Sequence, residues 1–231
     1  MDNKEILPIM WTENVDREFR AGRDIVHALK RINVKIQPGK LTILRGRSGS
    51  GKTTLMNIMG ALDNPTRGKV YFKGQEISRL SKSKQDELRR KSFGFVFQSV
   101  AIISIMSAFE NVDFGLRIAG YDPKHRKERA EECLRMVGLG KRMFHRAHEL
   151  SGGEQQRVAI ARAIAHKPEV IFADEPTAEL DTHMGLQVVK LFKTLVEQEG
   201  VTVVMTTHDP SMVEVADCVY TLEDGEVVDE N

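Results

Sequence analysis

Residues 46–53 decide the fold, and they read Gly46-Arg47-Ser48-Gly49-Ser50-Gly51-Lys52-Thr53. The stretch lies between an apolar run at 41–44, which we expect to be a buried strand, and residues 54–62, whose apolar residues have helical spacing. A glycine-rich loop in this context lets backbone N–H groups converge on phosphate oxygens at a helix N-terminus. Lys52 is expected to reach the β- and γ-phosphates, and Thr53 to bind Mg²⁺ through its hydroxyl. A chance match by a structural turn is the alternative, but the flanking strand and helix favour a nucleoside-triphosphate site.

A second apolar run, residues 170–173, ends in Asp174 and Glu175. In an extended chain, neighbouring side chains point to opposite sides. We therefore expect Asp174 to face Mg²⁺, through water, and Glu175 to face a nucleophilic water as its general base. A strand that merely ends in solvated acids is the alternative, and the phosphate loop in the same chain favours the catalytic interpretation.

Apolar runs alternate with helical patterns along most of the chain. This alternation predicts an α/β domain whose parallel strands are covered on both faces. Residues 99–165 have helical patterns without strands, so we expect a helical subdomain inserted into one α/β core made of residues 1–98 and 166–231.

Bulk composition narrows the possible partners and location. The formal charge is +1, from 34 basic and 33 acidic residues, which gives no electrostatic reason to expect a nucleic-acid partner. The two cysteines lie far apart and predict buried thiols in a reducing compartment. No apolar run approaches the ~18–20 residues that span a bilayer, and the N-terminus lacks a signal-peptide pattern. We expect a cytoplasmic protein that acts at a membrane, if at all, through another polypeptide.

Residues 150–156 read Leu150-Ser151-Gly152-Gly153-Glu154-Gln155-Gln156. Ser151 is expected to be the N-cap of a helix, with two glycines behind it that expose amides to an anion. This is a second phosphate-binding surface in a chain with one phosphate loop. A simple explanation is that it serves the phosphate loop of another copy.

With these motifs the chain resembles the nucleotide-binding subunits of ABC transporters over nearly its whole length. Residues 150–154 are similar to the signature LSGGQ, with Glu154 where glutamine is usual. The resemblance implies an α/β P-loop NTPase core of the ABC type, with an antiparallel β subdomain and an inserted helical subdomain. It also implies a head-to-tail dimer that encloses two MgATP molecules.

The resemblance assigns further site residues. Gln98 is similar to the Q-loop glutamine, a contact of Mg²⁺ and water, and residues 178–181 resemble the D-loop. His208 is similar to the switch histidine that contacts the γ-phosphate, and Phe19 to the aromatic that stacks on adenine, with Trp11 a weaker candidate. The expected catalytic residues are Lys52, Glu175 and His208, and the expected metal ligands are Thr53, Gln98 and Asp174. The expected nucleotide contacts are Phe19, Gly46, Arg47, Ser48, Gly49, Ser50, Gly51, Lys52, Thr53, Thr54, Gln98, Ser151, Gly152, Gly153 and Glu154.

Residues 60–66, 93–98 and 172–177 are similar to one branch of the family, which contains lipoprotein-releasing, macrolide-exporter, antimicrobial-peptide-resistance and cell-division ATPases. The resemblance implies an ATPase on the inner face of the cell membrane that powers export or mechanotransmission by a separate membrane-spanning permease. The alternatives are a regulatory ATPase of the cell-division type and a soluble ABC ATPase that acts on DNA or ribosomes. The apolar run at 100–106 either contacts the permease or belongs to the core of the helical subdomain. It lacks a proline common in the family, and Glu179 stands where a small or amide residue is common in the D-loop.

Overall fold

The computed structural model describes residues 7–22 and 24–230, and a six-stranded sheet forms the centre of this part of the chain. The strand order is β11-β10-β4-β9-β8-β7, with parallel pairing except between β10 and β11. The strands are β4 (Leu41–Arg45), β7 (Phe93–Val96), β8 (Val170–Asp174), β9 (Thr202–Thr207), β10 (Cys218–Glu223) and β11 (Glu226–Glu230). Parallel pairing places the carboxyl ends of β4, β7, β8 and β9 at one edge of the sheet, so the loops that follow these strands meet there.

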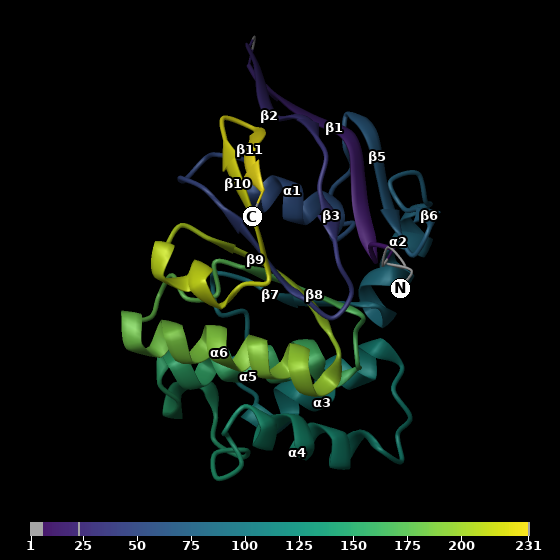
Figure 1. Cartoon of the computed structure of the whole chain (residues 1–231). Coiled ribbons are helices and arrows are strands. Elements are labelled where there is room, and N and C mark those ends of the chain that lie inside the picture. Colours follow the sequence, from purple (N-terminus) through teal and green to yellow (C-terminus); the bar gives the residue numbers. More distant parts are fainter. Residues whose placement is uncertain (1–6, 23, 231) are drawn as a thin grey trace, which may run out of the picture.

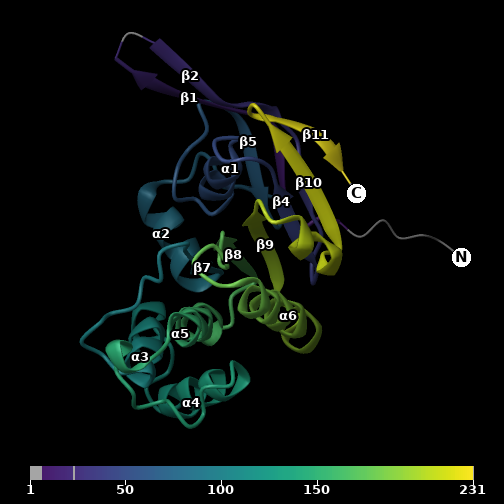
Figure 2. The same cartoon turned by 90° about the vertical axis from the view of Figure 1, so that its left-hand side faces the viewer.

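A second, antiparallel sheet lies beside the first and confirms the expected β subdomain (Figures 1 and 2). Its strands are β1 (Met10–Ala21), β2 (Asp24–Ile32), β3 (Lys35–Ile36), β5 (Arg67–Phe72) and β6 (Gln75–Glu76). β1 and β2 form a long hairpin that projects from the body of the molecule (Figure 2). β2 also contacts β11, so the two sheets approach each other at the C-terminal hairpin.

Helices cover the central sheet, and α3, α4, α5 and α6 lie on the side away from the antiparallel sheet (Figure 1). The helices are α1 (Lys52–Met59), α2 (Lys82–Lys91), α3 (Ala108–Ala119), α4 (Arg126–Met136), α5 (Gly152–Ala165) and α6 (Thr182–Glu199), with short 3₁₀ helices at Ala147–Glu149 and Pro210–Val215. Because α3, α4 and α5 lie between β7 and β8 in the chain, they are inserted into the α/β core as predicted. The boundaries at residues 98 and 166 stay a prediction.

Strands β4, β8 and β9 are buried on both faces, which explains their largely apolar sequences. Ile171 and Val203 belong to one hydrophobic cluster, whereas their neighbours Phe172 and Val204 belong to the cluster on the opposite face. The first cluster also contains Val112 of α3, together with residues of α4 and α5. The inserted helices therefore share their core with the sheet that carries the phosphate loop.

Within residues 7–22 and 24–230, no helix is both long enough and apolar enough to cross a membrane. Cys133 and Cys218 are free thiols, as predicted. Cys133 is buried, whereas Cys218 is only partly buried because β10 is covered less completely.

Candidate active site

The predicted phosphate loop connects the end of β4 at Arg45 to the start of α1 at Lys52. Gly51 has a φ of 101°, in the left-handed region where side chains are strained. A Cβ at this position would also lie 2.7 Å from the backbone oxygen of Ala28. Residue 51 must therefore be a glycine on two independent grounds, and the loop folds back tightly before the helix begins.

Lys52 is a buried cation at the floor of the loop, with 4% of its surface exposed. Its Nζ donates hydrogen bonds to the backbone oxygens of Gly46 (2.8 Å) and Arg47 (3.0 Å). It also lies 3.6 Å from Glu175 Oε1. A lysine ammonium has three donors, so two of them hold the loop and the third is directed to the side where Glu175 lies.

Ser50 carries a buried hydroxyl that has no hydrogen-bond partner within the described part of the chain. Buried polar atoms in native proteins are nearly always paired. An unpaired hydroxyl within a glycine-rich loop at a helix N-terminus fits a site for an anion such as a phosphate group.

The predicted metal ligands Thr53 and Asp174 are in direct contact. Thr53 Oγ1 donates to Asp174 Oδ1 at 3.0 Å, and Thr206 Oγ1 donates to the same carboxylate oxygen at 2.6 Å. Hydroxyl and carboxylate oxygens side by side are the ligands that Mg²⁺ prefers. Thr206 was not among the predicted site residues, although a polar residue two positions before His208 in an apolar strand was an available signal.

The expectation of an extended chain through both acids is wrong at Glu175. β8 ends at Asp174, and Glu175 has a φ of 41°, in the left-handed region. Its backbone N–H donates to Thr206 Oγ1 at 2.9 Å, so the next strand fixes this turn. The Glu175 carboxylate then lies between the Lys52 ammonium, 3.6 Å away, and the His208 imidazole, whose Nδ1 is 3.3 Å away.

Glu175 and His208 border an open cleft of about 880 Å³. Its lining includes the predicted residues Gly46, Arg47, Ser48, Glu175 and His208. It also includes residues that sequence reasoning missed, namely Arg45, Thr221, Glu223, Val228 and Asp229. Most of these belong to the β10–β11 hairpin, whose place beside the loop follows from sheet order and has no local sequence signal.

The glycine-rich stretch 151–154 forms a helix start, as predicted, but it does not line this cleft. Ser151 is the N-cap of α5 and accepts a hydrogen bond from the Glu154 N–H at 3.3 Å. The Glu154 carboxylate accepts one from the Ser151 N–H at 2.9 Å, and this bond lowers the pKa of Glu154 below its usual range. Gly152 is exposed, and a Cβ there would meet nothing within 4 Å. The helix start is therefore a surface that another molecule can approach.

Gln98 and Phe19, which were also predicted to contact the nucleotide, do not line this cleft. Gln98 is exposed two residues beyond β7, the strand next to β8. Phe19 is 40% exposed, and the guanidinium of Arg17 lies 4.4 Å from its ring centroid. Trp11 is stacked on Tyr71 with centroids 4.7 Å apart, so one of its faces is occupied by the sheet. Arg17 likewise covers one face of Phe19, but Phe19 is the more exposed of the two rings and stays the predicted stacking residue.

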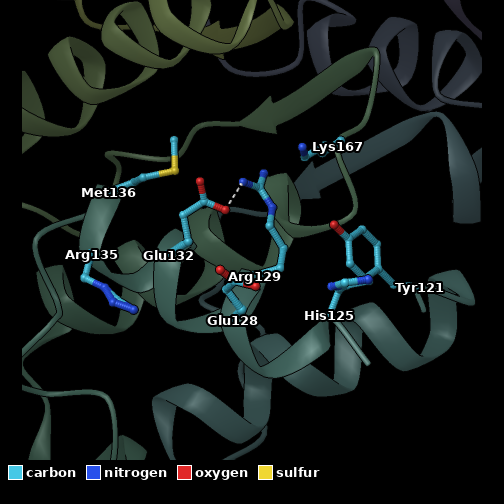
Figure 3. A pocket seen from close by; sticks show the side chains of 8 residues that line it. All are labelled: Tyr121, His125, Glu128, Arg129, Glu132, Arg135, Met136 and Lys167. Carbon is cyan, nitrogen blue, oxygen red and sulfur yellow. Dashed lines mark hydrogen bonds and ion pairs between the residues drawn. The ribbon is translucent and has the colours of Figure 1, made fainter. Parts of the chain in front are cut away.

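A separate hollow of about 500 Å³ lies on the helical segment beside α4 (Figure 3). Its buried cation is Arg129, which donates to the Ala165 and Ile164 backbone oxygens and to Glu132 Oε2. These bonds connect α4 to the C-terminal end of α5. The guanidinium is already paired, so this hollow offers a structural contact and not a second phosphate site.

A phosphate loop, two acids at the end of β8 and an inserted helical segment define a P-loop ATPase of the ATP-binding-cassette class. Comparison with known proteins gives the family directly: residues 29–178 match the model of the ABC transporter family. The chain belongs to this family and is an ABC ATPase.

Named relatives agree with this assignment. An uncharacterized ABC transporter ATP-binding protein of Methanocaldococcus jannaschii is 44% identical over 94% of this chain and 96% of its own length. The macrolide export ATP-binding/permease protein MacB of Bartonella henselae is 43% identical over the whole chain, which spans 35% of that relative. A solved structure, the ATP-binding cassette MJ0796 as a dimer in a post-hydrolysis state with ADP and Pi, has a TM-score of 0.88 and 40% identity, covering 96% of this chain and 97% of that one.

Proposed function

We propose that this chain is the ATP-binding and ATP-hydrolysing subunit of an export or mechanotransmission system, and that it works by ATP-driven dimerisation. The observation that carries the proposal is the meeting of Lys52, Asp174 and Glu175 at one loop, with His208 3.3 Å from Glu175. A phosphate-binding lysine, an Mg²⁺-type carboxylate and a second carboxylate next to a histidine are the groups that nucleoside-triphosphate hydrolysis requires.

In this proposal Thr53 would hold Mg²⁺ directly and Asp174 would hold it through water, and Gln98, two residues beyond β7, would be the third ligand. The direct contact between the Thr53 hydroxyl and the Asp174 carboxylate supports the fit of a hard cation at this point. When bound, Mg²⁺ supplies positive charge to the β- and γ-phosphate oxygens. Thr206 then acts as a second donor that keeps the Asp174 carboxylate in one orientation.

Glu175 is the proposed general base, and its ion pair with Lys52 links its availability as a base to nucleotide binding. Lys52 is 3.6 Å from its carboxylate, and a bound triphosphate would compete for that lysine. Once Lys52 faces phosphate, the Glu175 carboxylate is released to orient a water molecule. His208 stays on its other side, where it contacts the γ-phosphate and helps to position that water.

Each ATP site also uses residues from a second copy of this chain. Ser151 and Gly152 are exposed at the start of α5, with Gly153 buried behind them, and none of the three lines the cleft. A helix start favours an anion. The solved relative MJ0796 is a dimer, which supports the same assembly here. Each site would then combine the phosphate loop of one copy with residues 151–153 of the other.

A membrane-spanning permease is the proposed third component, at the inner face of the cell membrane. The MacB relative carries ATP-binding and permease functions in its name, and this chain covers only part of that protein. Of the apolar run at 100–106, Ile102 packs against the core, whereas Ile105 is 79% exposed. Phe144 is also largely exposed and lies 5.9 Å from the Phe109 ring, at the start of α3. Exposed apolar groups of this kind suit a protein contact.

Substitution of the general base tests the proposal. Glu175→Gln keeps the shape of the side chain and removes its basicity, so the variant should bind MgATP and accumulate as a dimer, measured by light scattering with chromatography. Lys52→Ala combined with Glu175→Gln is the matched control and should stay monomeric. Tight MgATP binding by the Glu175→Gln chain without any dimer would contradict ATP-driven dimerisation.

A further inference from the structure

The chain contains two tight hairpin turns with nearly the same backbone geometry. Asp224 and Gly225, between β10 and β11, have φ angles of 46° and 81°. Lys73 and Gly74, between β5 and β6, have φ angles of 49° and 82°. Positive φ at both central residues is the pattern of a type I′ turn, which suits a two-residue hairpin. The two turns differ in their surroundings.

In the turn at 224–225, both the backbone N–H and the backbone oxygen of Gly225 make hydrogen bonds to other segments. The Gly225 N–H donates to the backbone oxygen of Ser50 in the phosphate loop at 3.2 Å. The Gly225 oxygen accepts from the Lys30 N–H of β2 at 2.8 Å. One residue of the C-terminal hairpin therefore connects the phosphate loop to the antiparallel sheet. Neither bond involves the acids at the end of β8.

The same three segments are packed backbone against backbone. A Cβ at residue 225 would lie 2.8 Å from the Ala28 oxygen, and a Cβ at residue 51 would lie 2.7 Å from that same oxygen. A Cβ at Gly46 would lie 2.3 Å from the Leu222 oxygen of β10. Carbon atoms essentially never come this close to backbone oxygens, so an added methyl group must displace one of the segments. By contrast, a Cβ at Gly74 would meet nothing within 4 Å.

We infer that Gly225 is a positioning residue for phosphate binding: its turn braces the phosphate loop against β2, so that the amides of residues 49–52 keep the spacing that a triphosphate needs. The inference rests on the proposed ATP site and adds a remote element to it. The two hydrogen bonds of Gly225 reach Ser50 and Lys30, and neither involves Asp174 or Glu175. Disturbing this turn should therefore weaken nucleotide binding and leave the chemical step largely intact.

Gly225→Ala tests the inference, with Gly74→Ala as the matched control. Both variants place alanine at the same strained φ, so both carry that cost in stability, and Gly225→Ala adds the close contact with Ala28. Only the alanine at 225 presses on Ala28 beside the phosphate loop. We expect the Kd for MgATP, measured by calorimetry, to rise about tenfold, which corresponds to about 1.4 kcal/mol of binding. The KM for hydrolysis should rise by a similar factor, and kcat should stay within about twofold of the wild-type value. Gly74→Ala should keep the wild-type Kd.

A second pair of variants covers the case in which Gly225→Ala does not fold. Asparagine tolerates the left-handed region better than alanine, and Gly225→Asn carries the same Cβ toward Ala28. Gly74→Asn is its control. Equal MgATP affinities for the 225 and 74 variants would overturn the positioning role, as would a loss confined to kcat. Failure of the wild-type chain to bind MgATP would instead refute the ATP site itself, so the two failures are distinguishable.

Discussion

Replacement of Thr206 by valine removes one hydroxyl and keeps the shape of the side chain. That hydroxyl is fully buried, donates to Asp174 Oδ1 at 2.6 Å and accepts from the Glu175 N–H at 2.9 Å. A hydrogen bond to a charged group contributes about 1.5–3 kcal/mol, and a buried N–H left without a partner costs about 1–3 kcal/mol. Because the two effects overlap, we expect the free energy of unfolding to fall by about 2–4 kcal/mol.

The same variant should lose hydrolysis because both acids lose their support. The Asp174 carboxylate is no longer fixed from β9, and the turn that aims Glu175 loses its bond. A misplacement that costs about 1.4–2.8 kcal/mol in the transition state corresponds to a fall of about 10- to 100-fold in kcat. Phosphate release at saturating MgATP measures kcat, and urea unfolding measures stability.

Thr202→Val is the matched control at the other end of β9. Thr202 is also buried, and its hydroxyl accepts one hydrogen bond, from the Gly39 N–H at 3.0 Å, far from the acids. It should lose about 1 kcal/mol of stability and keep its kcat. A kcat for Thr206→Val within twofold of that for Thr202→Val would refute the argument that Thr206 supports the two acids.

Two further predictions concern stability. Thr42 has a buried hydroxyl without a hydrogen-bond partner in the described part of the chain, so Thr42→Val should raise the free energy of unfolding by about 0.5–2 kcal/mol; a fall in the urea midpoint would contradict this. Burial lowers the pKa of His166 below its ordinary value of 6.5, although the bond to the Phe93 oxygen opposes this. As the pH falls, His166 is therefore protonated in the unfolded chain before it is protonated in the folded chain. Its effect lowers the free energy of unfolding below about pH 6.5 and is absent above that pH. His166→Gln should flatten this part of the stability curve, and an unchanged slope between about pH 7.5 and about pH 5.5 would exclude the residue as its source.

The parts of the site that are local in sequence could be predicted from it. The loop at 46–53, the acids after β8 and the N-cap at Ser151 each depend on neighbours along the chain. The part played by Thr206 depends on strand register, since β8 and β9 pair Asp174 with Thr206 across the sheet. The left-handed backbone at Glu175 depends on the same pairing, because its N–H donates to Thr206. The sequence pattern does not show this pairing and therefore predicted an extended chain. Gly225 reaches Ser50 from the far end of the chain, and no spacing in the sequence reports such a contact.

The positive φ at Glu175 lowers folding stability at a residue whose carboxylate is needed for hydrolysis. A left-handed backbone costs a residue with a side chain roughly 1–2 kcal/mol, a strain that glycine avoids and asparagine reduces. Selection for heat resistance alone would favour those residues at 175, whereas hydrolysis needs a carboxylate there. A chain that has evolved at high temperature should therefore keep Glu175 and gain stability elsewhere, for example by replacing the unpaired polar residues in its core.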